Sequence, residues 1–155
     1  MKASENVIEK IKEFEGCRLV AYEDAGGVPT IGYGHTRNVR MGDKVSQYYA
    51  DEMLRQDIEE VEQQVNRLGA AKTQGQFDAL VSFVFNLGIL NLKKSTLLMV
   101  IRSYNRENGD QLFVKADRLR QEFLRWVHCG GKVLPGLVNR RQWEYECFIG
   151  KYSQE

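Results

Sequence analysis

The 155-residue sequence lacks several features that particular classes of protein need. No apolar run approaches the roughly 18 residues of a membrane-spanning helix. The first six residues are followed by no apolar stretch and no small-residue cleavage site, so we expect no signal peptide. With 43% hydrophobic and 28% charged residues, the composition excludes a disordered chain. We expect one globular domain spanning residues 1–155.

A strong surplus of either charge is also missing. There are 22 basic and 21 acidic residues, which gives a formal net charge of +1. Nucleic-acid-binding proteins usually carry a basic surplus, so we expect no nucleic-acid partner. The charges are nevertheless unevenly placed, because residues 43–67 hold seven acids and three bases, whereas residues 115–151 hold eight bases and four acids. We interpret these regions as solvated helix faces; a C-terminal half that contacts an anionic polymer is the alternative.

Patterns typical of metal sites and disulfide frameworks are missing as well. Cys17, Cys129 and Cys147 are scattered and form no Cys-x-x-Cys pair, and the sequence has only two histidines, His35 and His128. A zinc site needs such residues clustered at short spacing, so we expect no bound metal. We interpret the cysteines as reduced, buried thiols, with a regulatory disulfide as the alternative.

Hydrophobic periodicity and end signals predict mainly helices, with one hairpin near the N-terminus. The predicted helices span residues 5–14, 47–68, 74–87, 96–107, 112–127 and 135–149. Residues 19–22 and 28–34 are predicted strands on either side of a glycine-rich turn, and Gly130-Gly131 is predicted to be a flexible break. The expected fold class is α+β, with a small β-hairpin lobe at 15–45 and a larger helical part formed by 1–14 and 46–155.

Three residues near the first helix and the hairpin are candidates for chemistry. Glu15 ends the first predicted helix, where the helix dipole and burial beside Phe14 both disfavour an ionised carboxyl and so favour a proton donor. Asp24 lies in the turn, where solvent and backbone N–H groups can keep it ionised, and Thr30 offers a hydroxyl that can hold a water. Two carboxyls in different environments are the minimal apparatus of glycoside hydrolysis. On spacing alone, a solvated helix-end Glu and a turn-forming Asp are the simpler interpretation.

A longer pattern surrounds these residues. Residues 14–36 read FEGxRLxAYxDxxGxxTIGYGHT, residues 76–88 read QFDALVSFVFNxG, residues 95–98 read STLL, and residues 130–144 read GGKxLPGLxxRRxxE. In this order, the blocks resemble the signature of the phage lysozyme (endolysin) family of the T-even type. The similarity covers nearly the whole chain, and it implies a lysozyme-like fold in which the long helix 47–68 joins the β-hairpin lobe to the helical lobe.

The resemblance implies an activity and roles for the three candidates. Enzymes of this family are muramidases, which hydrolyse the β-1,4 bond between N-acetylmuramic acid and N-acetylglucosamine in bacterial peptidoglycan with net inversion. Glu15 would be the general acid, and Asp24 would position the attacking water with Thr30 as its hydroxyl partner. Inversion requires the two carboxyls to stand roughly 6.5–9.5 Å apart. No metal or organic cofactor is implied.

Further residues match family positions that line the sugar cleft. Thr36, Phe85 and Ser95 are expected to contact substrate, and the Asn86 amide is expected to contact an acetamido group. Core packing is the alternative for Phe85, a helix C-terminal position for Asn86, and a helix N-cap for Ser95.

Two supporting residues also match the family pattern. Arg140 is expected to orient Glu15 through an ion pair, with a solvated arginine as the alternative. His35 is expected to be structural, pairing with a carboxylate or a backbone carbonyl to hold the hairpin to the helices.

The resemblance finally implies where the protein acts. We expect a monomer that folds in the host bacterial cytoplasm without a membrane anchor and reaches peptidoglycan through a separate pore. The alternatives are a lytic transglycosylase, a glycan- or protein-binding module with this fold, and a helical nucleic-acid binder. The Asp24–Thr30 pair favours hydrolysis, because a transglycosylase uses an acid but no water-activating aspartate.

Overall fold

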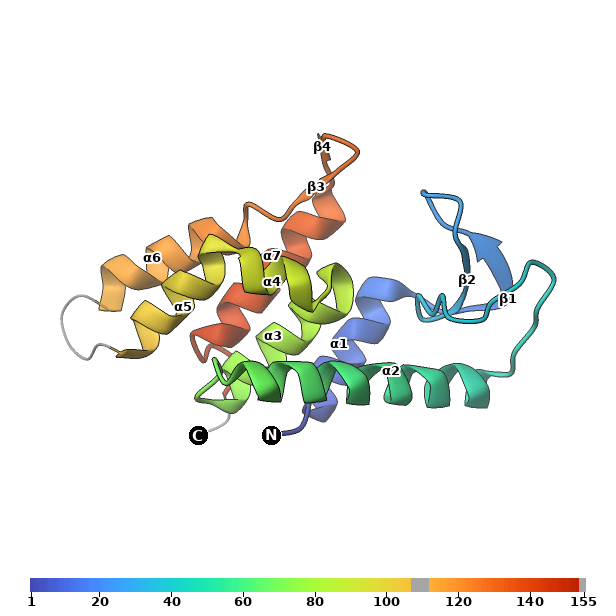
Figure 1. Ribbon diagram of the computed structural model, residues 1–155, viewed down its shortest axis with the longest axis horizontal. Helices are drawn as coiled ribbons and strands as arrows, with labels where there is room; N and C mark the ends of the chain where they lie inside the picture. The colour runs from blue at the N-terminus through green and yellow to red at the C-terminus, as the bar shows by residue number, and fades with distance from the viewer. Residues whose placement is uncertain (107–111, 154–155) are drawn as a thin grey trace.

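The computed structural model describes residues 1–106 and 112–153. Figure 1 shows a small lobe of two strands on the right and a group of helices on the left, with the long helix α2 (Gln47–Leu68) running beneath both. This is the expected α+β arrangement of a hairpin lobe and a helical lobe joined by a long helix. At 22 residues α2 is the longest helix, and none of the described helices is both long and apolar enough to span a bilayer.

The other elements follow the predicted order, with two additions. They are α1 (Glu5–Glu15), β1 (Arg18–Glu23), β2 (Pro29–Gly32), α3 (Gln74–Leu87), α4 (Ile89–Lys94), α5 (Thr96–Arg106), α6 (Leu112–Phe123), β3 (His128–Cys129), β4 (Lys132–Val133) and α7 (Pro135–Phe148). The prediction missed α4 and the β3–β4 hairpin, whose turn is the Gly130-Gly131 pair that we expected to be a flexible break. The predicted end of the helix after residue 106 lies outside the described residues.

Helix α3 forms the centre of the helical lobe. It is apolar on nearly every side, and it packs against α1, α2 and α7. Its fully or almost fully buried apolar side chains are Phe77, Ala79, Leu80, Val81, Phe83 and Val84. Burial of each large side chain among them stabilises the fold by about 1.5–3 kcal/mol. At the start of α3, a Cβ on Gly75 would collide with the Cys147 carbonyl oxygen of α7, so glycine permits the close approach of these two helices.

Two glycines determine which residues end the helices next to the site. The N–H of Gly16, at φ +66°, donates to the Lys12 carbonyl at 2.9 Å, so α1 ends at Glu15. The N–H of Gly88, at φ +85°, donates to the Val84 carbonyl at 2.8 Å and ends α3. Positive φ suits glycine because it lacks a Cβ. Glu15 is therefore the last helical residue of α1.

The hairpin lobe is built on the antiparallel pair β1–β2, and in the described residues β2 has no further strand beside Pro29. Tyr22 lies opposite Thr30 and Glu23 lies opposite Pro29, so the proline needs no second ladder partner. The segment that leads into α2 pairs with β1, through a bridge between Val20 and Lys44. These contacts place the turn after β1, which contains Asp24, at the tip of the lobe.

Candidate active site

Glu15 is fixed by an arginine from the far end of the chain. Its Oε1 accepts a hydrogen bond from Arg140 Nη1 at 2.8 Å, and the two side chains are 20% and 4% exposed. Arg140 is itself held by α3, because its Nε donates to Ser82 Oγ at 3.2 Å and its Nη2 donates to the Ser82 carbonyl at 3.1 Å. The structure thus brings together α1, α3 and α7 at one carboxyl group.

The backbone of the hairpin lobe approaches the same carboxyl. A Cβ added to Gly34 would lie 2.8 Å from Glu15 Oε2, and Gly34 has φ +72°. Both the close approach and the backbone conformation require glycine at this position. Glu15 is therefore positioned by Arg140 through one oxygen and confined by the lobe at the other.

Asp24 lies in an exposed turn and is held by neutral backbone groups. Its Oδ1 accepts hydrogen bonds from the N–H groups of Gly26 at 2.8 Å and Val28 at 2.9 Å, which is an aspartate turn of the kind that short polar side chains favour. Its own N–H donates to the Val28 carbonyl at 3.0 Å. Within the described part of the chain, Oδ2 accepts no hydrogen bond, so one carboxylate oxygen faces solvent.

Thr30 is connected to Asp24 through Val28. The buried Thr30 hydroxyl, 3% exposed, donates to the Val28 carbonyl at 2.8 Å, while the Val28 N–H donates to Asp24. Among the described residues the Thr30 hydroxyl makes no direct hydrogen bond to Asp24. Because the Thr30 hydroxyl donates its proton to the Val28 carbonyl, it can bind a water only as an acceptor, through its lone pairs.

A cavity of about 630 Å³ adjoins Glu15. Glu15, Asn86 and Arg140 line it together with Phe14 and the segment 134–137 that begins α7. The helices therefore place three of the predicted site residues, Glu15, Asn86 and Arg140, in the lining of one cavity. The predicted residues of the lobe, Asp24, Thr30 and Thr36, lie outside the lining of this cavity, and Thr36 is exposed.

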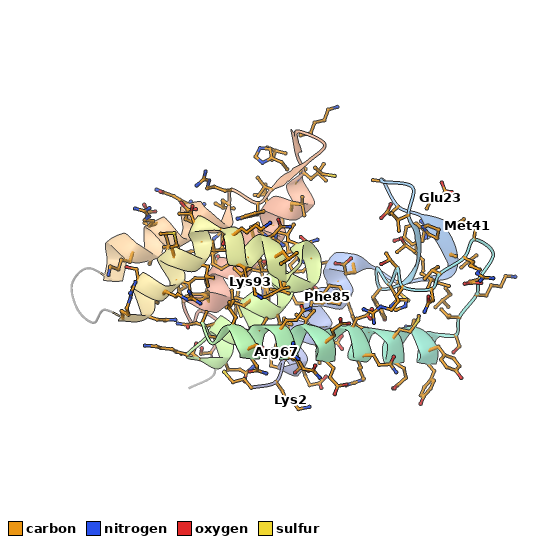
Figure 2. All side chains as sticks on the ribbon, in the orientation of Figure 1. Lys2, Glu23, Met41, Arg67, Phe85 and Lys93 are labelled. Carbon is orange, nitrogen blue, oxygen red and sulfur yellow. The ribbon has the colours of Figure 1, made fainter. Side chains whose placement is uncertain are left out.

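The other predicted substrate contacts have structural partners. Phe85 is half-buried against the core, and Figure 2 labels it at the end of α3 that lies beside the C-terminal end of α1. The Ser95 hydroxyl donates to the Leu92 carbonyl at 2.7 Å and accepts from the Leu98 N–H at 3.1 Å, so it caps α5. Ser95 also borders a second hollow of about 290 Å³ beside Trp126.

His35 links the lobe to α2. Its Nδ1 lies 2.8 Å from Asp57 Oδ2 on α2, and its Nε2 lies 3.0 Å from the Arg37 carbonyl. Both ring nitrogens are occupied by these partners, so the imidazole is placed as a connection between the two parts of the site rather than as a group aimed at a substrate.

Sequence reasoning missed a second arginine next to the site. Arg141 and Glu144 on α7 are both fully buried, with Arg141 Nη2 2.8 Å from Glu144 Oε1. The same nitrogen donates to Asn86 Oδ1 at 2.8 Å. Burial raises the pKa of Glu144 to about 7, against the opposing effect of the two neighbouring arginines. The Arg-x-x-Glu spacing was visible in the sequence, but it is equally typical of an exposed pair on a helix surface.

The described residues show no cluster of potential metal ligands. Within residues 1–106 and 112–153, no group of three or more His, Cys, Asp or Glu side chains is placed to bind an ion. The thiols of Cys17, Cys129 and Cys147 are free, but the expectation that they are buried is correct only for Cys147. Cys17 is half-buried, and Cys129 is exposed because it lies in the two-residue strand β3, which is exposed. The chemistry available at the site is that of carboxyl groups, an arginine and an amide.

Comparison with known proteins assigns a family to this fold. The phage lysozyme family model matches residues 12–144. The endolysin of Acyrthosiphon pisum secondary endosymbiont phage 1 is 39% identical over 153 residues, covering 96% of this chain and 98% of that protein.

Two solved structures are also similar over nearly their whole length. The muramidase domain of SpmX from Asticaccaulis excentricus is 35% identical with a TM-score of 0.79, covering 96% of this chain and 97% of that one. The endolysin from Escherichia coli O157:H7 phage FAHEc1 is 32% identical with a TM-score of 0.79, covering 100% and 98%. The lysozyme-like fold expected from the sequence is confirmed, and the chain belongs to the phage lysozyme family.

Proposed function

We propose that this protein hydrolyses the β-1,4 bond between N-acetylmuramic acid and N-acetylglucosamine in bacterial peptidoglycan, with Glu15 as general acid and Asp24 as the carboxylate that positions water. Membership of the phage lysozyme family makes the chain a lysozyme-type glycoside hydrolase of the endolysin class. The observation that carries the mechanism is the contrast between the two carboxyls. Glu15 is fixed by Arg140 beside a cavity, whereas Asp24 presents one free oxygen to solvent.

The proposed reaction has two coupled parts. Protonated Glu15 donates its proton to the glycosidic oxygen as the bond to the sugar breaks, and positive charge develops on the anomeric carbon. Asp24 orients a water, with the lone pairs of Thr30 as a second anchor, and accepts its proton as the water attacks from the opposite face. Attack opposite the leaving group inverts the anomeric configuration.

Positioning carries much of the catalysis in such a site. Arg140, Ser82 and Gly34 restrict Glu15, and the backbone N–H groups of residues 26 and 28 restrict Asp24. Groups that are already oriented avoid the entropy cost of alignment in the transition state. Thr36, Phe85 and Ser95 are proposed as further contacts along the glycan, and Asn86 as a contact to an acetamido group.

The proposed biological role is host-cell lysis by a monomer. In this proposal the enzyme folds in the host cytoplasm and reaches the periplasmic wall after a separate pore opens the inner membrane. Peptidoglycan is its partner, and no cofactor takes part.

Turbidity loss of outer-membrane-permeabilised Gram-negative cells tests the proposal. Wild type is expected to lyse the cells, and Glu15→Gln, which keeps the shape but removes the proton donor, is expected to fail while remaining folded. Lysis by both proteins would refute Glu15 as the acid, and lysis by neither would favour a glycan-binding module.

Mass analysis of the products separates hydrolysis from the transglycosylase alternative. Hydrolysis leaves a reducing sugar, whereas a lytic transglycosylase leaves an anhydro sugar that is one water lighter. We expect reducing ends, because Asp24 and Thr30 can hold a water next to the sugar.

A further inference from the structure

Two consecutive arginines of α7 reach two positions of α3 that are one helical turn apart. Arg140 bonds to Ser82, and Arg141 bonds to Asn86, four residues further along α3. Residues i and i+4 lie on the same face of a helix. Arg140 also donates a hydrogen bond to Glu15. Arg141 makes no hydrogen bond to Glu15 in the described residues, but its partner Asn86 lines the cavity beside Glu15. Arg141 therefore contacts a side chain that borders the cavity proposed to bind substrate.

Arg141 is held in place from three sides. Its guanidinium lies 5.0 Å from the centre of the Phe83 ring, its Nη2 lies 2.8 Å from Glu144 Oε1, and the same nitrogen donates to Asn86. The side chain is completely buried. A guanidinium with these neighbours has no alternative position without leaving a charge unpaired in the core.

Stabilisation of the fold does not explain this buried pair. Arg141 Nε and Nη1 and both Glu144 oxygens have no hydrogen bond of good geometry among the described residues. A buried ion pair compensates for its desolvation only if its remaining polar atoms are satisfied, and apolar residues of similar volume are often at least as stabilising. The pair is better explained by what it positions.

The group it positions is the Asn86 amide. A side-chain amide has one oxygen acceptor and an NH2 group with two donors. Arg141 has only donors, so the group facing it must be Oδ1, and Nδ2 is left as the free end of the amide. Within the described residues Nδ2 donates to no protein group, and the side chain borders the 630 Å³ cavity. Asn86 therefore offers a hydrogen-bond donor in a fixed orientation.

We propose that Arg141 and Glu144 are positioning residues that hold the Asn86 NH2 group ready to donate to the acetamido carbonyl of a bound N-acetyl sugar. The inference rests on the proposed function and adds a source of specificity to it. Glu144 fixes Arg141, Arg141 fixes the orientation of the amide, and Asn86 contacts the substrate. An N-acetyl sugar supplies the carbonyl acceptor, whereas a de-N-acetylated sugar presents an ammonium group, which can only donate.

The test compares kcat/KM on peptidoglycan sacculi before and after enzymatic de-N-acetylation. Asn86→Leu is expected to lower kcat/KM on N-acetylated sacculi about 5- to 10-fold, the value of one hydrogen bond, and to change kcat/KM on de-N-acetylated sacculi little. Asn86→Asp keeps the contact to Arg141 but removes the donor, so we expect the same selective loss. An unchanged preference in both variants would overturn the proposal.

The double variant Arg141→Met, Glu144→Leu tests the positioning residues themselves. It removes both buried charges at once, so it is expected to fold. We expect a reduced preference for N-acetylated sacculi, because the amide is free to rotate; a preference equal to that of wild type would contradict the role of the pair. Asn91→Leu is the matched control, because Asn91 lies outside the lining of this cavity and its amide donates to the Leu87 carbonyl, and the preference of this variant should stay unchanged.

The outcomes distinguish this inference from the proposed function. If wild type cleaves neither preparation, the proposed hydrolysis fails and the inference fails with it. If wild type cleaves sacculi and Glu15→Gln does not, but the Asn86 variants keep the wild-type preference, only the inference fails.

Discussion

The two proposed catalytic carboxyls are held in opposite ways. Asp24, in the hairpin lobe, is exposed, and its Oδ1 is bonded by the N–H groups of residues only two and four positions away. Glu15, in the helical part, is mostly buried, and its partner Arg140 is 125 residues away. The lobe uses neutral backbone dipoles and short-range contacts, whereas the helices use charged side chains that the tertiary fold brings together.

Because of this difference, a substitution of Asp24 can change activity with little effect on stability, whereas a substitution among the buried charges near Glu15 changes both. An exposed turn can lose its carboxylate charge at little cost, because solvent replaces what the protein loses. A buried charge that loses its partner is destabilising, because no water reaches it. A variant that removes only the charge of Asp24 should therefore affect activity alone, and variants of the buried charges in the helical half should affect both.

The largest expected effect on stability is that of Glu144→Leu. The substitution leaves the Arg141 guanidinium fully buried without its carboxylate, so the free energy of unfolding should fall by about 3–5 kcal/mol. The double variant with Arg141→Met should recover most of that loss. Urea unfolding of both variants measures this, and a cost below about 1 kcal/mol for the single variant would show that the pair is not electrostatically coupled.

The second-largest effect is expected for Gly34→Ala, because Gly34 of the hairpin lobe lies against the Glu15 carboxyl of the helical part. The positive φ costs about 1–3 kcal/mol, and the new Cβ would also displace the Glu15 carboxyl, so we expect a loss of activity of about 100-fold. Gly69→Ala is the matched control, because its φ of +67° is similar and nothing lies within 4 Å of the added carbon. Thermal unfolding should show destabilisation in both variants, and kcat/KM should show inactivation only for Gly34→Ala.

Substitutions of Asp24 should separate activity from stability within the lobe. Asp24→Ala removes the acceptor of two backbone N–H groups and should cost about 1 kcal/mol. Asp24→Asn keeps the Oδ1 acceptor and should be as stable as wild type. Both should lose hydrolytic activity, so retention of activity by Asp24→Asn would refute the water-positioning role.

The smallest effect is a pH dependence where the lobe meets α2. Hydrogen bonds from Gln47 and Tyr33 lower the pKa of Asp51 below its usual 3.8, despite partial desolvation. Because the folded pKa is lowered, Asp51 stabilises the protein above pH 3.8, and this contribution is lost as the pH falls through the folded value. Melting temperatures of wild type and Asp51→Asn should converge toward low pH; a constant difference across the acid range would contradict this.

Local signals accounted for most of the fold. The caps and apolar periodicity identified the long helices within a few residues, and the glycine-rich turn identified the hairpin. The misses were α4, with six residues, and β3–β4, with two residues in each strand. Elements this short contain too few residues to show a periodicity.

The site was predictable to different degrees in its two halves. The hydrogen-bond partners of Asp24 lie within four residues of it in the chain, so the turn pattern in the sequence was enough to predict its environment. The contact between Glu15 and Arg140 was expected only from the family resemblance. The chain from Glu144 through Arg141 to Asn86 was not predicted, because an Arg-x-x-Glu spacing is the same whether the helix face is solvated or packed in the core.

The stereochemistry of the first product distinguishes water positioned by Asp24 from any retaining mechanism. Proton NMR during the first turnovers of a short β-1,4-linked glycan reports which anomer of the new reducing end forms before mutarotation. We expect the α-anomer first, because in the proposed mechanism Asp24 delivers water opposite the bond that Glu15 protonates. Initial formation of the β-anomer would show retention, and would contradict the assignment of Asp24 as the group that positions water.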